Sequence, residues 1–221
     1  MISTVLFDAG NTLVWVDHTL IAATAGIPDP EDVRKADRAL RQAMNDHLLN
    51  KSTESCDFFQ AYHGGMLRDA GLPAGEIPAA LERLRKVDRI LSLWRRANPE
   101  ARPAVKALKA KGIRVGIVSN SDGRGSTLLE ACGRDDLFEM IIDSHIVQIE
   151  KPDPRIFLLA CERMGIRPEN TAYVGDIPCV DVTGSRSAGL TPILYDPLDA
   201  FPEWKDCARI RDLRALPKIL E

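Results

Sequence analysis

Short apolar runs that stop at a polar residue or a glycine recur along the chain. Each run spans three or four residues and is followed by residues that favour turns. Continuous apolar runs of about this length are typical of strands that are covered on both faces. The pattern predicts five such strands, at residues 5–7, 115–118, 140–142, 172–174 and 192–195.

Segments with helical periodicity separate these runs. Residues 100–111 carry apolar side chains at helical spacing and are followed by Gly112, and residues 154–164 likewise stop at Gly165. Strands that alternate with helices predict an α/β fold, a doubly wound parallel sheet with helices on both faces. After the fifth strand we expect an irregular Pro-rich segment and then a last helix at residues 213–220.

The stretch from residue 17 to residue 98 has another pattern, without an evident strand. Helical periodicity marks residues 31–49 and 79–94, and prolines or glycines separate the helical segments. We therefore expect an all-helical domain at residues 17–98, planted after the first strand. Two linkers would join it to a core domain made of residues 1–16 and 99–221.

Composition narrows the class of protein. A formal net charge of −3 in 221 residues gives no bulk field for binding nucleic acid or an anionic membrane surface. The five cysteines are scattered, which argues against a disulfide framework or a structural zinc site and favours a reducing, cytoplasmic setting. The start shows no signal-peptide pattern, and no apolar run approaches the ~20 residues of a membrane span. The oligomeric state is left open.

Three polar side chains stand where predicted strands end. Asp8 follows the first strand, Ser119 the second and Asp176 the fourth. Because the carboxyl ends of parallel strands meet at one edge of a sheet, we expect these side chains to converge there. Taken singly, such residues are more often helix caps or turn formers, and a residue such as Lys151 is ordinarily a surface lysine.

The order of the polar motifs carries more information than any one of them. The chain holds Asp8-Ala9-Gly10-Asn11-Thr12, then Ser119-Asn120, then Lys151-Pro152, then Gly175-Asp176 with Asp181 five residues on. This set resembles the haloacid dehalogenase-like (HAD) hydrolase superfamily, whose four motifs occur in that order. The resemblance covers nearly the whole chain and implies a Rossmann-like core with a C1-type helical cap at the inserted domain.

The resemblance also implies a magnesium-dependent hydrolase with a carboxylate nucleophile. Asp8 would attack the substrate, and Asp8, the Gly10 carbonyl, Asp176 and Asp181 would form the metal site. Mg2+ prefers such oxygen ligands and keeps several waters, one of which Asp181 would orient. The metal would bridge the nucleophile and a phosphoryl group and neutralise developing charge.

Three further residues complete the implied site. Lys151 would pair with Asp8 and keep it ionised, and Ser119, Asn120 and Lys151 would bind the phosphoryl oxygens of the substrate. The catalytic set implied by the resemblance is therefore Asp8, Ser119 and Lys151. The expected partner is a small phosphorylated metabolite.

One departure from the family pattern bears on the rate. Phosphatases of the superfamily usually carry a second aspartate two residues after the nucleophile, as a general acid and base, where this chain has Gly10. Such catalysis is typically worth ~10²–10⁴ in rate, so a slow phosphatase that favours good leaving groups is expected. Candidates for a substitute, by location alone, are Asp17, His18, His47 and His63.

The same departure keeps other interpretations open. The 2-haloacid dehalogenase branch also has a non-acid at this position and a Ser-Asn second motif, but it lacks the Gly-Asp that this chain has at Gly175-Asp176. The phosphonatase branch would need a Schiff-base lysine in the cap, for which Lys51 is the candidate. A third interpretation is a phosphate-binding module, or a regulatory module phosphorylated on Asp8, without rapid turnover.

Overall fold

The computed structural model describes residues 1–49, 58–124 and 137–220. Contacts between residues divide the chain into two compact units. The core unit consists of Met1–Trp15 and Arg96–Glu221, and the helical unit consists of Val16–Arg95.

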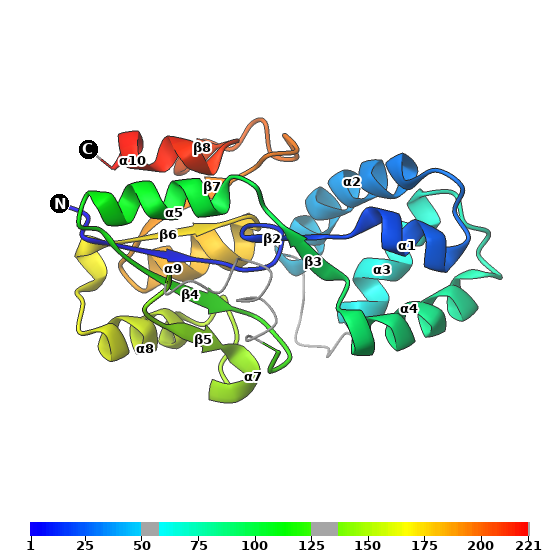
Figure 1. Cartoon of the computed structure of the whole chain (residues 1–221), viewed down its shortest axis with the longest axis horizontal. Coiled ribbons are helices and arrows are strands. Elements are labelled where there is room, and N and C mark those ends of the chain that lie inside the picture. Colours follow the sequence, from blue (N-terminus) through cyan, green and yellow to red (C-terminus); the bar gives the residue numbers. More distant parts are fainter. Residues whose placement is uncertain (50–57, 125–136, 221) are drawn as a thin grey trace. The chain divides into compact units, whose positions relative to one another are not determined.

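A single parallel sheet of six strands organises the core unit (Figure 1). The strand order is β5-β4-β1-β6-β7-β8, so β1 lies between β4 and β6 in the middle of the sheet. All five pairings are parallel. The strands are β1 (Thr4–Phe7), β4 (Arg114–Ser119), β5 (Ile141–Asp143), β6 (Thr171–Gly175), β7 (Thr191–Tyr195) and β8 (Ala208–Ile210).

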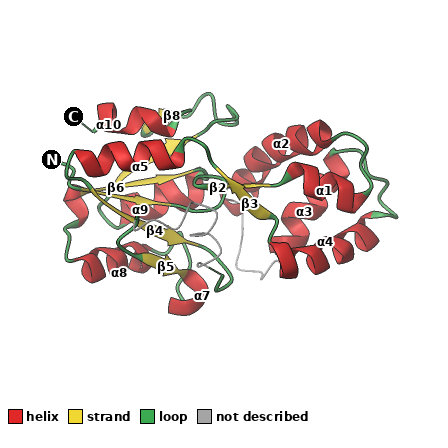
Figure 2. Cartoon of the chain, viewed as in Figure 1, coloured by secondary structure: helices red, strands yellow, loops and turns green. Residues whose placement is uncertain are grey.

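Helices cover both faces of this sheet (Figure 2), as predicted from the alternating pattern. Successive side chains of a strand point to opposite faces, and Leu6, Val118 and Tyr173 share one apolar cluster with Phe157 of α8. The helical elements in the described part of the core unit are α5 (Ala101–Ala110), α7 (Ser144–Val147), α8 (Pro154–Met164), η1 (Pro168–Asn170), η2 (Pro178–Val182), α9 (Thr183–Ser187), η3 (Leu213–Ala215) and α10 (Leu216–Ile219).

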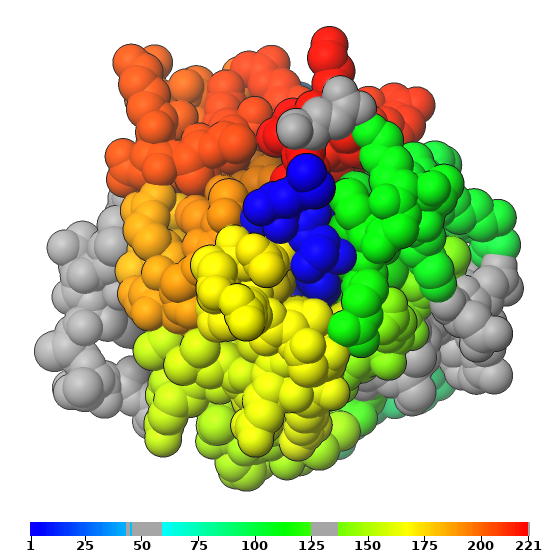
Figure 3. Space-filling model, turned by 90° about the vertical axis from the view of Figure 1, so that its left-hand side faces the viewer, coloured from blue at the N-terminus to red at the C-terminus, as the bar shows by residue number. Residues whose placement is uncertain are grey.

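The amino ends of the central strands meet on one surface of the core unit. Thr4 of β1 is in register with Arg114 of β4 and Thr171 of β6. Figure 3 shows the first residues of the chain (blue) at the surface, beside segments coloured green and yellow. The carboxyl ends of the same strands, with Asp8 and Asp176, therefore lie at the opposite edge.

The C-terminal part of the core unit differs from expectation. A strand, β8, replaces part of the predicted irregular segment, and the predicted helix at 213–220 is a 3-10 turn followed by one helical turn. Arg209 of β8 binds Asp196 and Asp199 through one guanidinium nitrogen, at 2.7 Å from each carboxylate. These ion pairs fix a three-residue edge strand that is too short to show a hydrophobic pattern.

In its described residues, the helical unit has four helices around their own apolar core. Asp17 caps the first helix by accepting from the Leu20 amide at 3.1 Å, and Gly26 ends it in the left-handed region at φ 85°. Arg83 donates to the carbonyl groups near that C-terminus, those of Thr24 and Ala25. The helices are α1 (His18–Ala25), α2 (Pro30–Leu49), α3 (Phe58–Asp69) and α4 (Ile77–Leu91).

Two short strands, β2 (Val14–Val16) and β3 (Trp94–Ala97), carry the chain between the units and pair with each other. The expectation that residues 17–98 hold no strand is therefore wrong, as is the extension of the last helix to Trp94. That helix stops earlier because the Asp88 carboxylate accepts from the Leu93 amide at 2.8 Å. Ser92, at φ 55°, then turns the chain out of the helix.

Within the described ranges, no helix has both the length and the hydropathy needed to cross a membrane.

Candidate active site

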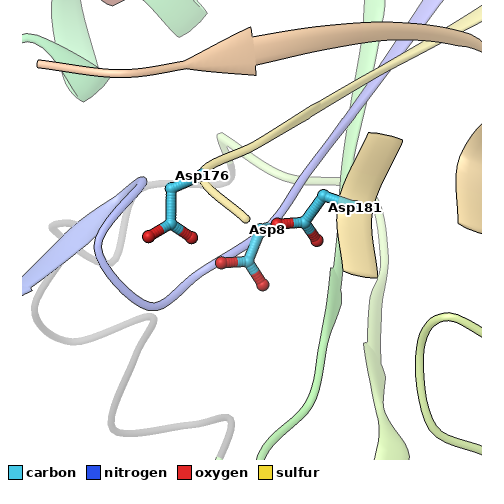
Figure 4. A group of neighbouring side chains, drawn as sticks. All are labelled: Asp8, Asp176 and Asp181. Atoms are coloured by element: carbon cyan, nitrogen blue, oxygen red, sulfur yellow. The ribbon is translucent and has the colours of Figure 1, made fainter. Parts of the chain in front are cut away.

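Three buried carboxylates converge at the carboxyl edge of the sheet (Figure 4). Asp8 directly follows β1, Asp176 directly follows the neighbouring β6, and Asp181 lies in the π-helical turn η2 that comes next. One oxygen from each lies within 4.8 Å of the others. Adjacent strand ends and a tight turn thus bring together residues that are 168 and 173 positions from Asp8.

Lys151 reaches this cluster from the loop before α8. Its ammonium donates to Asp8 Oδ1 at 2.5 Å, Asp181 Oδ1 at 2.7 Å and the Tyr173 hydroxyl at 2.9 Å. An ammonium has three protons, so these three acceptors use them all. The Lys151 side chain is only 3% exposed, so solvent does not compete for these bonds.

Asn120 holds the main chain of Lys151 in place. Its side-chain oxygen accepts from the Lys151 amide at 2.8 Å, and its side-chain nitrogen donates to the Lys151 carbonyl at 3.0 Å. The residue expected to bind substrate therefore makes two bonds to the loop that carries the lysine. Ser119, just before it, is the buried last residue of β4, the strand beside β1.

The position of the Asp181 carboxylate requires a glycine at residue 175. A Cβ added to Gly175 would lie 2.3 Å from Asp181 Cγ, far inside contact distance. Asp181 Oδ2 also accepts from the Ile177 amide at 2.9 Å. The second oxygen of the carboxylate is thereby left to Lys151, so Gly175 has a packing role in addition to its place in the motif.

The turn after Asp8 is held by its own main chain and by Asn98. The amides of Leu13 and Val14 both donate to the Ala9 carbonyl at 2.9 Å. Asn98 donates from its side chain to the Thr12 carbonyl at 2.8 Å and from its amide to the Leu13 carbonyl at 2.9 Å. Nothing in the sequence pattern singled out Asn98, because its role depends on where the returning chain passes the turn.

Burial sets the proton affinities of the site. Loss of solvent raises the pKa of Asp8 to about 6, with Asp181 adding to the rise and Lys151 opposing it. Burial alone would lower the pKa of Lys151, but the Asp181 and Asp8 carboxylates outweigh it and raise that pKa well above its usual value. Lys151 is therefore a permanent cation at neutral pH.

The donor set fits a divalent cation. Three carboxylates and one ammonium leave a formal excess of negative charge among buried groups, and uncompensated buried charge is costly. Closely spaced carboxylate oxygens without histidine or cysteine are the ligands that Mg2+ prefers. These residues therefore suit a hard cation bound by oxygen.

Comparison with known proteins decides the family. The family model for haloacid dehalogenase-like hydrolases matches residues 2–189. The chain belongs to this family of hydrolases. It is 29% identical over 211 residues to the haloacid dehalogenase-like hydrolase domain-containing protein 3 of Danio rerio, covering 88% of this chain and 85% of that protein.

A phosphatase is among the relatives of this HAD hydrolase. The phosphoserine phosphatase of Thermus thermophilus is 34% identical over 158 residues, which cover 67% of this chain and 61% of the phosphatase. The chain is also 36% identical over 106 residues to a glyceraldehyde 3-phosphate phosphatase of Methanothermobacter thermautotrophicus, a match that spans less than half of either protein.

Solved structures show the same fold. The HAD-hydrolase YfnB of Bacillus subtilis, solved with magnesium, matches with a TM-score of 0.72 at 21% identity, covering 100% of this chain and 99% of that one. A dehalogenase with an intermediate complex matches with a TM-score of 0.69 at 23% identity, covering 99% and 96%. At these identities the likeness establishes the fold, which phosphatases and dehalogenases of the family share.

Three candidates for a substitute acid and base, Asp17, His18 and His63, have structural partners in the helical unit. Asp17 caps α1, and His18 Nε2 lies 3.0 Å from the buried Asp37 carboxylate. His63 is fully buried, and burial lowers its pKa to about 4. The side chain of His47 and the whole of Lys51 lie outside the described residues.

Proposed function

We propose that this HAD hydrolase is a magnesium-dependent phosphatase that uses Asp8 as its nucleophile on a small phosphorylated metabolite. The observation that carries the proposal is the buried cluster of three carboxylates, in which the Lys151 ammonium lies 2.5 Å from Asp8 Oδ1. A dehalogenating carboxylate attacks carbon without a metal, and for it the further carboxylate of Asp176 would have no cation to bind. The phosphatases among the relatives point the same way.

The residues have distinct parts in the proposed reaction. An Asp8 oxygen forms a bond to phosphorus while the bond from phosphorus to the leaving-group oxygen breaks, which gives an acyl phosphate on Asp8. Water then attacks that phosphorus, the bond to the Asp8 oxygen breaks, and inorganic phosphate leaves. The Ser119 hydroxyl is proposed to hydrogen-bond the phosphoryl oxygens as charge develops on them. Lys151 is proposed to do the same by sharing, between Asp8 and the phosphoryl group, the proton that it donates to Asp8 in the structure.

Asp8, the Gly10 carbonyl and Asp176 would hold the cation, with Asp181 beside them. When bound, Mg2+ would supply positive charge that offsets the negative charges of the nucleophile and of the phosphate dianion. Asp181 is proposed to act chiefly through its bonds to Lys151 and to the Ile177 amide, at 2.7 and 2.9 Å.

Gly10 determines which phosphates turn over well. With no carboxylate at this position, the leaving oxygen must depart without a proton from that place. We expect acetyl phosphate and p-nitrophenyl phosphate, whose leaving groups are stable anions, to react faster than alkyl phosphates such as phosphoserine. The expected ratio of rates is ~10²–10⁴, the factor that general acid catalysis typically contributes. Steady-state phosphate release from the three substrates measures this trend.

The decisive test compares four conditions on those substrates. We expect phosphate release with Mg2+ and at least a hundredfold less with EDTA or in the Asp8→Asn variant. Asp212→Asn is the matched control, because Asp212 is a surface residue paired with Arg214, and it should keep full activity. Equal rates for Asp8→Asn and the unsubstituted protein would overturn the proposal.

Two further measurements distinguish the proposed phosphatase from a dehalogenase and from a regulatory module. Chloride release from 2-chloropropionate that is indifferent to EDTA would identify a dehalogenase, the function favoured by the non-acidic Gly10. A long-lived phosphate on Asp8 after incubation with acetyl phosphate, seen by intact mass without turnover, would identify a regulatory module. We place the protein in a reducing cytoplasm, in keeping with Cys161, Cys179 and Cys207, which form no disulfide with a described residue.

A further inference from the structure

Tyr173 lies beneath the carboxylate cluster, on the central strand β6. Its side chain is 1% exposed, and its ring meets the edge of Phe157 from α8 at 4.8 Å between centroids and 86° between planes. A tyrosine held in this way has little freedom to turn. The sequence pattern identified this residue only as part of a buried strand.

The hydroxyl of Tyr173 has a fixed direction. It donates its one proton to the Val118 carbonyl at 2.8 Å, and it accepts from Lys151 Nζ at 2.9 Å. Burial raises the pKa of Tyr173 well above its usual value, so the hydroxyl keeps that proton. Because the proton is committed to Val118, the lone pair that remains faces the lysine.

The three acceptors of the Lys151 ammonium therefore differ in kind. Asp8 and Asp181 are carboxylates, and both belong to the set proposed to share a cation and the phosphoryl group. Tyr173 is neutral, belongs to the rigid sheet and takes no part in metal binding. Its position is set by the Val118 carbonyl and the Phe157 ring, neither of which belongs to the set proposed to bind substrate.

We propose that Tyr173 is a positioning residue for catalysis, which ties the Lys151 ammonium to the main chain of β4 so that it meets both Asp8 and the transferred phosphoryl group. The inference rests on the proposed function. Without the hydroxyl, one ammonium proton has no acceptor, and Lys151 shifts toward the carboxylates and away from the substrate oxygens. The hydrogen bonds from Lys151 to those oxygens strengthen as negative charge builds up on them, so the shift slows the reaction.

The test is the Tyr173→Phe variant with acetyl phosphate and Mg2+. We expect kcat to fall about tenfold while KM changes less than twofold, as when an interaction is weakened mainly in the transition state. Affinity for orthovanadate, which imitates the transferring phosphoryl group, should fall by a similar factor. A purely structural role would only lower the fraction of active enzyme, and that leaves the orthovanadate inhibition constant unchanged.

A second variant guards against misfolding. Incorporation of 3-fluorotyrosine at position 173 keeps the shape of the side chain and makes its oxygen a poorer acceptor, so we expect a smaller loss of kcat and of orthovanadate affinity in the same proportion. An unchanged orthovanadate constant in both proteins would overturn the role of Tyr173. Failure of the unsubstituted protein to hydrolyse phosphates or bind orthovanadate would instead overturn the proposed function.

Discussion

Asp181 leaves no space for a side chain at residue 175. A methyl group on Gly175 would stand 2.3 Å from Asp181 Cγ, so Gly175→Ala must displace the carboxylate from Lys151 and from the Ile177 amide. We expect at least a tenfold loss of phosphatase activity with retained far-UV circular dichroism. Gly75→Ala is the control, because an added Cβ there meets nothing within 4 Å. Full activity of Gly175→Ala would show that the position of Asp181 is not required.

A proton and the proposed cation compete for Asp8. Burial raises the pKa of Asp8 to about 6, so below that pH the metal-free site holds a proton that a ligating carboxylate must lose. We expect the apparent affinity for Mg2+, measured by calorimetric titration, to be constant above about pH 7. Below about pH 6 it should fall by up to tenfold per pH unit. Affinity that is flat from pH 7 to pH 5 would contradict Asp8 as a ligand.

At the residue level, the sequence could predict position where strand ends alone determine it, while the roles of these residues stay predictions. Asp8, Ser119 and Asp176 end parallel strands, and such ends converge whatever the details of packing. Tyr173 and Asn98 were missed because their roles depend on side-chain reach across strands, which the register and the path of the returning chain decide. An apolar pattern does not distinguish a core tyrosine from one that binds a lysine.

At the scale of elements, α3 carries a histidine inside the apolar core of the helical unit. His63 is fully buried between the rings of Phe59 and Trp94, with Nδ1 at 3.1 Å from the Phe59 carbonyl. No described residue bonds its Nε2. Burial lowers the pKa of His63 to about 4; the Asp88 and Asp37 carboxylates favour the proton and Arg85 opposes it.

The lowered pKa of His63 predicts acid sensitivity. The unfolded chain binds this proton below about pH 6.5 and the folded one only below about pH 4, so stability falls by up to about 3 kcal/mol across that window. His63→Phe should remove this part of the loss. The difference in unfolding free energy between variant and unsubstituted protein, from urea titrations, should therefore shift in favour of the variant from pH 7 to pH 4.5. A constant difference would refute the assignment.

The lowered pKa of Asp37 affects stability in a lower pH range than that of His63. Burial raises this pKa, but Arg41, His18 and Tyr62 together lower it below its usual 3.8. Its contribution to stability is present above that value and is lost only at lower pH. Asp8, with a pKa of about 6, titrates within the window but does so in both proteins. Its contribution therefore cancels in the difference between His63→Phe and the unsubstituted protein, and that difference reports on His63.

The five predicted strands and the helix at 154–164 were confirmed, whereas three further short strands were missed. The predicted helix at 154–164 matches α8, and each predicted strand overlaps an observed one. The three missed strands, β2, β3 and β8, have three or four residues, and β3 is largely exposed. They exist through pairing and ion pairs, which a pattern along the chain does not contain.

For the whole molecule, fold and chemistry are separate questions. A dehalogenase matches this fold with a TM-score of 0.69, and a phosphoserine phosphatase is among the relatives of the chain. A fold of this kind does not choose between attack on carbon and attack on phosphorus. The choice lies in a few side chains at one edge of the sheet, where this chain has two carboxylates beside its nucleophile.

The pairing of β2 with β3 matters for the entropy of the chain. The chain enters the helical unit through β2 and leaves it through β3, and these two strands pair. For the core unit, the helical unit is therefore a long loop whose two ends are held together by strand pairing. The entropic cost of closing a loop grows only with the logarithm of its length. Lengthening the helical unit would therefore add little to the entropic cost of folding the core unit. Inserts of very different size are thus compatible with the same arrangement of side chains at the carboxyl edge of the sheet.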